Sequence, residues 1–275
     1  MIWFDGQLTS QAHIDATSAG LLLGWGIFTT LAIREGAPVF WRRHAARLRR
    51  DAAAARVEFS FGEAQLYAGL TQLLDAENIR DGHARITGTK RGDGRWNAEK
   101  GAHWSITAQT AAAPSTAPLR LEVSPSRVAA RAPLAGVKTT SYLPYFIAWE
   151  EARAGGFDEA LLLNENDWIC ESARASIFWA KAGALYTPSL DCGCLRGVGR
   201  AVVLERFEVR QGRWPLAALW DADEAFVVSG AAGVRALGSI CDAGQIREWD
   251  KIGTLTKAIQ KIFRQDEQDL QDETG

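Results

Sequence analysis

Apolar and polar positions in the first 110 residues follow two spacings, and each spacing predicts a type of element. Apolar residues three and four positions apart indicate helices, whereas short runs rich in branched and aromatic residues indicate strands. A Glu-Gly pair at 35–36 predicts a turn between two of the strands. The predicted strands are 2–5, 30–34, 38–41, 84–88 and 103–108, and the predicted helices are 43–57 and 63–74.

The same patterns recur after residue 118, with strands and helices mixed along the chain. Residues 160–170 contain two apolar runs around a polar tip, which predicts a β-hairpin. The other predicted strands are 119–123, 176–180, 184–187 and 224–228, and the predicted helices are 145–154, 199–210 and 252–263. Strands and helices do not alternate in a regular strand-helix-strand array, and the pattern therefore predicts the α+β class.

A segment rich in alanine, proline and small polar residues, 111–118, separates two halves that each mix strands with helices. Such a composition is typical of a linker, because it shows neither helical nor strand spacing. We therefore predict a small N-terminal domain over residues 1–110, a linker over 111–118 and a larger C-terminal domain over 119–275.

Composition limits the partners of the chain. Its 275 residues are 47% hydrophobic, which is enough to bury a sizeable core, and the net charge is −2. Acidic and basic residues are interspersed, so no basic face indicates nucleic acid, and a small molecule is the expected partner. No apolar run approaches the roughly 18 residues that a membrane helix needs, and the first residues lack a signal-peptide pattern. We therefore expect a cytoplasmic protein with no membrane partner.

Four cysteines, Cys170, Cys192, Cys194 and Cys241, are too few for a disulfide framework in a chain of this length. We expect them to be reduced. Cys192 and Cys194 lack a second Cys or His pair at zinc spacing, and no metal site is predicted.

Two residues about thirty positions apart carry the chemistry that a pyridoxal phosphate (PLP) cofactor requires from a protein. Lys138 stands in a segment of small polar residues, and a desolvated lysine amine can form a Schiff base. Glu171 stands shortly before a predicted strand, and its carboxylate could accept a hydrogen bond from a protonated pyridine nitrogen. Each residue alone has an ordinary alternative, a solvated lysine before a helix and a glutamate on an edge strand. Their occurrence together favours the cofactor.

A third segment is suited to an anion. Val198 and Gly199 lie where a glycine-rich loop enters a predicted helix, and the first amides of a helix have no partner within it. Arg47 lies among several other arginines of a predicted helix, and its residue type alone fits surface charge equally well. Arg200 is expected to lie on the surface. The glycines at 24–26 are not spaced as a nucleotide fingerprint, and we expect them to allow close packing.

The segments around Lys138 and Glu171, with residues 24–30, 44–48 and 193–200, resemble the class IV aminotransferase family, the fold-type IV PLP enzymes. The resemblance runs through nearly the whole chain. It implies a two-domain α+β fold similar to D-amino-acid aminotransferase, a homodimer, and a catalytic Lys138 that joins pyridoxal 5'-phosphate. The implied cofactor contacts are Lys138, Arg47, Glu171, Ser176, Val198, Gly199 and Gly230.

The resemblance implies a substrate that is a carboxylate-bearing amine. Residues 28–30 are Phe-Thr-Thr, similar to 4-amino-4-deoxychorismate lyase, which forms 4-aminobenzoate and pyruvate, whereas amino-acid aminotransferases commonly have Phe-Glu. The loop 91–96 resembles a lyase loop that carries an arginine for a substrate carboxylate. Residues 139–142 depart from the Asn-Arg pair of the best-known bacterial lyases, so a branched-chain or D-amino-acid aminotransferase stays an alternative. The implied substrate contacts are Phe28, Thr29, Arg95 and Tyr142.

Three positions depart from the family pattern near the phosphate. Ser176 stands where asparagine is usual, Gly199 where threonine is usual, and Gly230 where threonine or serine is usual. Losing two hydroxyl contacts at about 1 kcal/mol each would loosen PLP by roughly one to two orders of magnitude. We therefore expect weak retention of PLP. A family member that has lost catalysis and acts as a binding protein is a further alternative.

Overall fold

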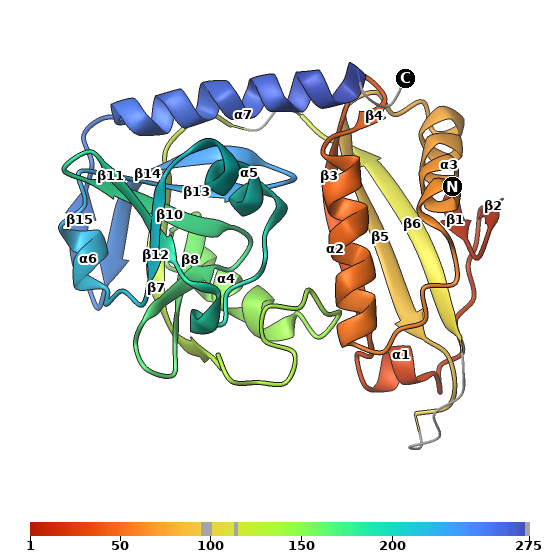
Figure 1. The fold of residues 1–275 in the computed structure, drawn as a ribbon. Helices are drawn as coiled ribbons and strands as arrows, with labels where there is room; N and C mark the ends of the chain where they lie inside the picture. Colours follow the sequence, from red (N-terminus) through yellow and green to blue (C-terminus); the bar gives the residue numbers. More distant parts are fainter. Residues whose placement is uncertain (95–100, 113–114, 273–275) are drawn as a thin grey trace. The chain divides into compact units, whose positions relative to one another are not determined.

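The computed structural model describes residues 1–94, 101–112 and 115–272, with side chains to residue 265. The chain divides into two compact units (Figure 1). The first comprises Met1–Ala113, Val137–Tyr142 and Leu270–Gly275, and the second comprises Pro114–Gly136 and Leu143–Asp269. The segment that carries Lys138 therefore belongs to the first unit, although the sequence places it within the predicted C-terminal domain.

The first unit is built on a six-stranded sheet in the order β2-β1-β6-β5-β3-β4. Every neighbouring pair of strands is antiparallel. The elements are β1 (Ile2–Phe4), β2 (Gln7–Thr9), α1 (Ala19–Leu22), β3 (Gly26–Arg34), β4 (Ala37–Pro38), α2 (Trp41–Ala54), α3 (Glu63–Ala76), β5 (Gly82–Lys90) and β6 (Ala102–Thr110). The continuous pairing of β3 with β5 fixes which of their side chains share a face.

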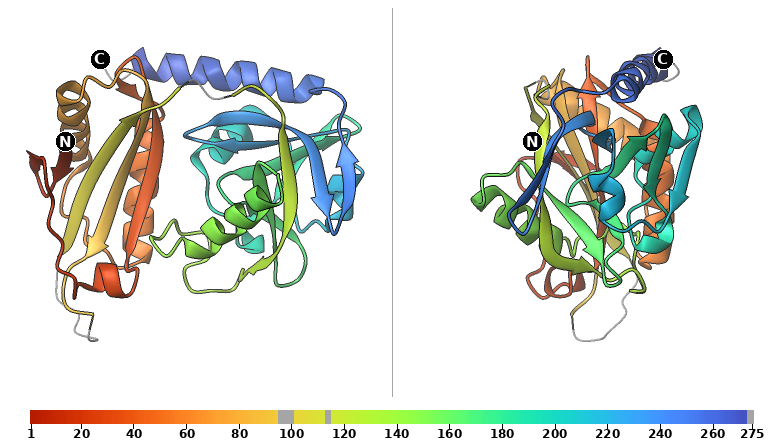
Figure 2. Two further views of the ribbon diagram at one scale, coloured as in Figure 1. Left: turned by 180° about the vertical axis from the view of Figure 1, so that it is seen from behind. Right: turned by 90° about the vertical axis from the view of Figure 1, so that its left-hand side faces the viewer.

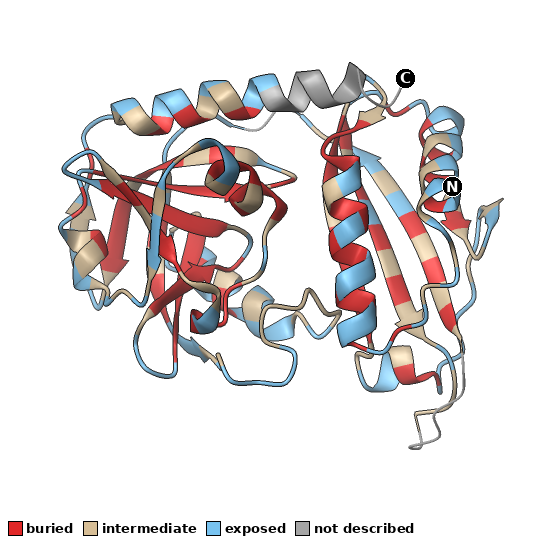
Figure 3. Ribbon diagram, viewed as in Figure 1, coloured by how far each residue is buried: buried red, intermediate tan, exposed pale blue. Residues whose placement is uncertain are grey.

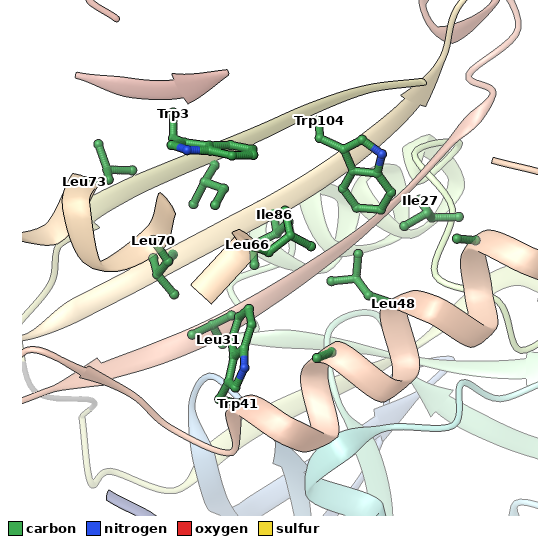
Figure 4. Close-up of a cluster of buried hydrophobic side chains, with 14 of the residues drawn as sticks. Trp3, Ile27, Leu31, Trp41, Leu48, Leu66, Leu70, Leu73, Ile86 and Trp104 are labelled. Carbon is green, nitrogen blue, oxygen red and sulfur yellow. The ribbon is translucent and has the colours of Figure 1, made fainter. Parts of the chain in front are cut away.

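Helices α2 and α3 pack their apolar side chains against this sheet and form the core of the first unit (Figure 4). Ile27, Leu31 and Ile33, alternate residues of β3, belong to this core. Trp41 of α2 meets Tyr67 of α3 edge to face, with ring centroids 5.3 Å apart. Because side chains alternate along a strand, even-numbered residues of β3 face the opposite side of the sheet.

The second unit contains a mixed sheet of nine strands, eight of which follow the order β12-β11-β10-β13-β14-β7-β8-β9, while β15 pairs with β14. The strands are β7 (Leu119–Val128), β8 (Glu159–Asn164), β9 (Ile169–Ser172), β10 (Ser176–Lys181), β11 (Ala184–Pro188), β12 (Val209–Gly212), β13 (Glu224–Ser229), β14 (Gly233–Asp242) and β15 (Gln245–Glu248). The helices are α4 (Leu143–Ala154), the 3-10 helix η1 (Leu190–Cys192), α5 (Val198–Arg206), α6 (Ala217–Trp220) and α7 (Thr254–Asp272).

Burial in the second unit is deepest along two neighbouring strands. Every residue of β8 and β9 is buried. Figure 3 shows how much of this unit's sheet is buried, in red. Helix α4 lies against β7 and β8 (Figure 2). A charged side chain on β9 is therefore held away from bulk water.

The predicted α+β class is confirmed, and most predicted elements are present. Several boundaries differ, and in two places the predicted element extends into a different type of structure. Helix α5 ends at Arg206 and not at residue 210, because residues 209–212 form β12 and pair with β11. The predicted strand 38–41 is reduced to β4, because Phe40 takes a left-handed conformation with φ 54° and Trp41 begins α2.

Strand β14 was not predicted, and two of its ten residues, Gly233 and Gly238, interrupt its apolar run. Among the described helices, none combines the length and the apolar character that crossing a membrane requires.

Candidate active site

The lysine segment lies against strand β3 as an additional extended piece. The Phe28 amide donates to the Lys138 carbonyl at 3.0 Å, and Ile27 forms an isolated antiparallel bridge with Thr139. The Lys138 amide itself donates to Oδ2 of Asp51, on α2, at 3.3 Å. The backbone around the lysine is therefore fixed by a strand and a helix of the first unit.

The glycines at 24–26 allow this close approach. A Cβ at Gly24 would lie 2.4 Å from Ser141 Oγ, and a Cβ at Gly26 would lie 2.8 Å from Thr140 Oγ1. The Thr140 amide donates to the Gly26 carbonyl at 2.9 Å. The expected packing role of these glycines is confirmed.

Two aromatic rings surround the Lys138 amine. Its Nζ lies 4.6 Å from the centroid of the Phe28 ring and 4.4 Å from that of Tyr142. It also donates a hydrogen bond to the Tyr142 hydroxyl at 3.2 Å. The two rings meet edge to face at 5.3 Å. The structure thus brings together three of the residues that the sequence singles out, and places the amine beside two aromatic rings and a hydroxyl group.

Arg85 joins this cluster, and sequence reasoning missed it. Its guanidinium carbon lies 3.6 Å from the centroid of the Phe28 ring, and its Nε donates to Thr87 Oγ1 at 3.2 Å. A guanidinium stacked on a ring keeps its in-plane donors for an anion. The feature that would have indicated Arg85 is the register of β5 with β3. This register places Arg85 opposite Thr30, on the same face of the sheet as Phe28. Hydrophobic patterns do not reveal such a register.

Arg47 is a buried cation on helix α2. Its residue is 8% exposed, and its Nη2 donates to the Thr29 hydroxyl, which lies 2.7 Å from His44 Nδ1. Burial lowers the pKa of Arg47 to about 10, so the side chain stays charged at neutral pH. Its Nε is buried and makes no hydrogen bond within the described residues. A buried guanidinium with an unused donor fits a phosphate.

Thr29 lies on the helix face of β3, away from Phe28. It is fully buried, and its hydroxyl is engaged by His44 and Arg47. The predicted substrate contact at Thr29 is therefore not supported by this geometry, because neighbouring residues of a strand point to opposite faces.

Glu171 lies on β9 in the second unit and is 2% exposed. Its Oε1 accepts a hydrogen bond from the Tyr145 hydroxyl at 3.2 Å, and its Oε2 accepts one from the Leu195 amide at 3.1 Å. Both of these donors are neutral groups, and together they orient the carboxylate. A buried carboxylate of this kind fits a protonated ring nitrogen.

The start of helix α5 lies close to the ends of β10 and β13. Gly197 precedes the helix, and Val198 and Gly199 form its first turn. A Cβ at Gly197 would lie 2.8 Å from Ser176 Oγ, which shows how near the hydroxyl is to the helix start. Ser229, the last residue of β13, precedes Gly230. The structure therefore gathers the predicted phosphate residues of the second unit around amides that attract anions.

The departure at Gly199 has a steric cause. A Cβ at this position would lie 2.7 Å from Val228 Cγ2 and 3.0 Å from the backbone carbonyl carbon of Ser229. The helix packs so closely on β13 that a side chain does not fit without movement. Compared with the family pattern, Gly199 lacks a threonine hydroxyl. The structure shows that a glycine is present there because the packing against β13 leaves no room for a side chain.

Gly199→Thr is therefore expected to destabilise the protein by about 1–3 kcal/mol through overpacking. Gly62→Thr is the control, because Gly62 precedes α3 with φ −66° and a Cβ there would contact only a glutamine side-chain oxygen at 3.6 Å. Urea unfolding of the two variants measures the difference. Equal stability of both variants would show that the contact with Val228 is not limiting.

Two further arginines differ from expectation. Arg200 is 5% exposed and donates to the Pro188 carbonyl at 3.0 Å and to Gln211 Oε1 at 2.7 Å, so the expected surface position was wrong. It ties α5 to β11 and β12. Arg95, the predicted carboxylate contact, lies outside the described residues.

The four cysteines are free and buried. Burial raises the pKa of Cys194 to about 12, and the Glu171 carboxylate acts in the same direction, so this thiol is protonated and unreactive at neutral pH. Among the described residues, no group of three or more His, Cys, Asp or Glu side chains is placed to hold a metal ion.

Comparison with known proteins decides the family. Residues 26–240 match the family described as amino-transferase class IV. The chain belongs to the class IV aminotransferase family. It is therefore a PLP-dependent enzyme. Its fold is similar to that of the branched-chain aminotransferase of Thermoproteus uzoniensis solved with norvaline, with a TM-score of 0.87, 26% identity, and coverage of 96% of this chain and 93% of that chain. The predicted fold-type IV architecture is confirmed.

Relatives in this family differ in the reaction they catalyse. The chain is 26% identical to the aminodeoxychorismate lyase of Bacillus subtilis, with coverage of 100% of this chain and 97% of the lyase. It is 27% identical to the branched-chain-amino-acid aminotransferase of Escherichia coli K12, with coverage of 95% of this chain and 91% of that enzyme. Identity places the chain equally near to both activities.

Proposed function

We propose that this class IV enzyme is a 4-amino-4-deoxychorismate lyase that releases pyruvate and forms 4-aminobenzoate. The observation that carries the proposal is the position of the Lys138 amine between the rings of Phe28 and Tyr142. Aromatic rings beside the reacting amine suit a substrate with an unsaturated six-membered ring that becomes planar when it aromatises. The Phe-Thr-Thr sequence at 28–30 and the similarity to the Bacillus subtilis lyase support the same choice.

We propose the following roles for the residues that would hold PLP. Lys138 joins the cofactor, and Glu171 accepts a hydrogen bond from the ring nitrogen. Arg47 and the amides of Val198 and Gly199 hold the phosphate, with Ser176 and Gly230 beside them. When bound, PLP supplies an electron sink for a substrate carbanion.

The proton transfers fall to Lys138 and Tyr142. The Lys138 amine is small, basic and already hydrogen-bonded to the Tyr142 hydroxyl, so it can take a proton from a substrate carbon and deliver it elsewhere. The hydroxyl keeps the amine in one orientation between the two rings.

Arg85 is proposed to bind a substrate carboxylate. Its stack on Phe28 holds the guanidinium in one plane, and this plane can present two parallel donors. Arg85→Gln is expected to raise KM by roughly 10- to 100-fold with a smaller change in kcat, because a charged hydrogen bond is lost. Arg85→Lys keeps the charge but loses the planar donors, and it is expected to recover only part of the affinity. An unchanged KM in Arg85→Gln would remove this residue from the substrate site.

An amino-acid aminotransferase is the second candidate, favoured by the 27% identity to the Escherichia coli aminotransferase. The deciding experiment adds amino acids alone to the PLP-loaded protein and follows the visible spectrum. A lyase is expected to show no lasting conversion, and to form 4-aminobenzoate from 4-amino-4-deoxychorismate. Conversion to pyridoxamine phosphate that a 2-oxo acid reverses would make the protein an aminotransferase.

The proposal includes a homodimer that acts in the cytoplasm in folate synthesis. Light scattering of the purified protein tests the assembly, and a mass of one chain would contradict it. If the protein converts neither substrate class, we would conclude that it is a family member that has lost catalysis.

A further inference from the structure

Three neighbouring polar side chains lie in the core of the first unit. Thr29 is fully buried, His44 is 1% exposed and Arg47 is 8% exposed. The Thr29 hydroxyl stands between the other two, 2.7 Å from His44 Nδ1 and hydrogen-bonded to Arg47 Nη2. Polar groups at this depth are costly unless each is satisfied or serves a ligand.

The chemistry of the groups fixes the direction of the hydrogen bond from Arg47, whereas the direction of the hydrogen bond with His44 depends on the His44 tautomer. A guanidinium has donors and no acceptor, so the Thr29 oxygen must accept from Arg47. The single hydroxyl proton of Thr29 is then available to donate to His44 Nδ1. A neutral His44 that accepts at Nδ1 carries its proton on Nε2. Burial keeps His44 neutral by lowering its pKa well below the usual value, and the charges of Arg47 and Lys138 add to the effect.

Two nitrogen atoms of this cluster take no part in these hydrogen bonds. Arg47 Nε and His44 Nε2 are buried, and neither has a hydrogen-bond partner within the described residues. Helix α2 fixes the spacing of His44 and Arg47, which are three residues apart on one face. Asp51, one turn further on, accepts from Arg50 at 3.0 Å and from the Lys138 amide at 3.3 Å. Its charge opposes the effect of burial on the pKa of Arg47.

We propose that Thr29 is a positioning residue, whose hydroxyl links His44 to Arg47 and holds the guanidinium with a free donor for the phosphate of PLP. The inference rests on the proposed phosphate role of Arg47. It replaces the substrate contact expected for Thr29. A side chain without a hydroxyl would leave the Arg47 Nη2 and His44 Nδ1 unpaired and let the guanidinium rotate.

The test compares PLP with pyridoxal, which lacks the phosphate, by titration of Thr29→Val, Thr29→Ser and the wild type. Thr29→Val is expected to weaken PLP binding by roughly 10- to 100-fold, because a hydrogen bond to a charged group is lost. Its affinity for pyridoxal should stay within about twofold of wild type, because the phosphate is absent. Thr29→Ser, which keeps the hydroxyl, should restore PLP binding.

Arg47→Gln separates this inference from the proposed function. In its background Thr29→Val should cause no further loss of PLP affinity, because both changes act through the same contact. If Arg47→Gln weakens PLP but Thr29→Val does not, or if Thr29→Val weakens PLP and pyridoxal equally, the positioning role is overturned. If Arg47→Gln itself leaves PLP affinity unchanged, the phosphate role fails and the inference fails with it.

A second measurement needs no substitution at Thr29. Nitrogen chemical shifts of the wild-type histidines, with His44 assigned by loss of its signals in His44→Asn, report which ring nitrogen carries the proton. A proton on Nε2 supports the link. A proton on Nδ1 would overturn it, because the hydroxyl could not then donate to that atom.

Discussion

Lys138→Ala is expected to abolish the visible absorption band of bound PLP and to reduce turnover by roughly 10³-fold or more. The substitution removes the amine that joins the cofactor and moves the proton, while the backbone contacts of residue 138 with Phe28 and Asp51 stay in place. The measurement is the spectrum after PLP addition and desalting, with turnover of 4-amino-4-deoxychorismate measured in parallel.

Lys181→Ala is the matched control, because Lys181 is an exposed lysine whose Nζ lies 3.4 Å from Asp223 Oδ1. It should retain both the band and the activity. A Lys138→Ala protein with wild-type turnover would exclude both the lyase and the aminotransferase. A wild type that shows no band after desalting would agree with the weak PLP retention predicted from Ser176, Gly199 and Gly230.

Glu171→Gln is expected to lower kcat by roughly 10²- to 10³-fold while leaving the fold intact. The amide oxygen can still accept from the Leu195 amide while the NH2 group donates to the Tyr145 hydroxyl, so both contacts can be kept in that orientation. The negative charge is lost, and with it the support for a protonated ring nitrogen. The measurement is kcat with saturating PLP, together with the unfolding midpoint.

Glu159→Gln is the control for removing a buried glutamate. Glu159 is 3% exposed, lies on β8 and accepts from Arg174 Nε at 2.8 Å. Burial raises its pKa, although Arg174 opposes this. We expect this variant to change stability and to leave kcat near wild type. Equal losses of kcat in the two variants would show that Glu171 acts through the fold and not on the cofactor.

The local pattern of the sequence predicted the elements that position the site but not the faces on which side chains meet. Lys138, Phe28 and Tyr142 were singled out from motifs, and the structure brings them together in the first unit. Arg85 was missed, and Thr29 was grouped with Phe28 although the two side chains lie on opposite faces of β3, because both placements depend on strand register and alternation. Registers are set by pairing partners distant in the chain, which periodicity does not encode.

Burial was the second kind of information that the sequence lacked. Arg200 resembles any arginine at a helix start, yet its contacts with Pro188 and Gln211 are made by segments that precede and follow it. Arg47 shares a helix with exposed arginines and differs from them only in the face it occupies. The roles of these residues toward PLP stay predictions that the experiments above address.

The close packing of Gly199 against Val228 also limits which substitutions these two positions can accept during evolution. A threonine at position 199 becomes tolerable only when residue 228 is smaller and α5 sits slightly farther from β13. If the threonine came first, it would overpack the core, and if the smaller residue at 228 came first, it would leave a cavity. Each change alone would therefore destabilise the protein. The two positions are thus expected to vary as a pair, because a hydroxyl side chain at position 199 requires a compensating change at position 228.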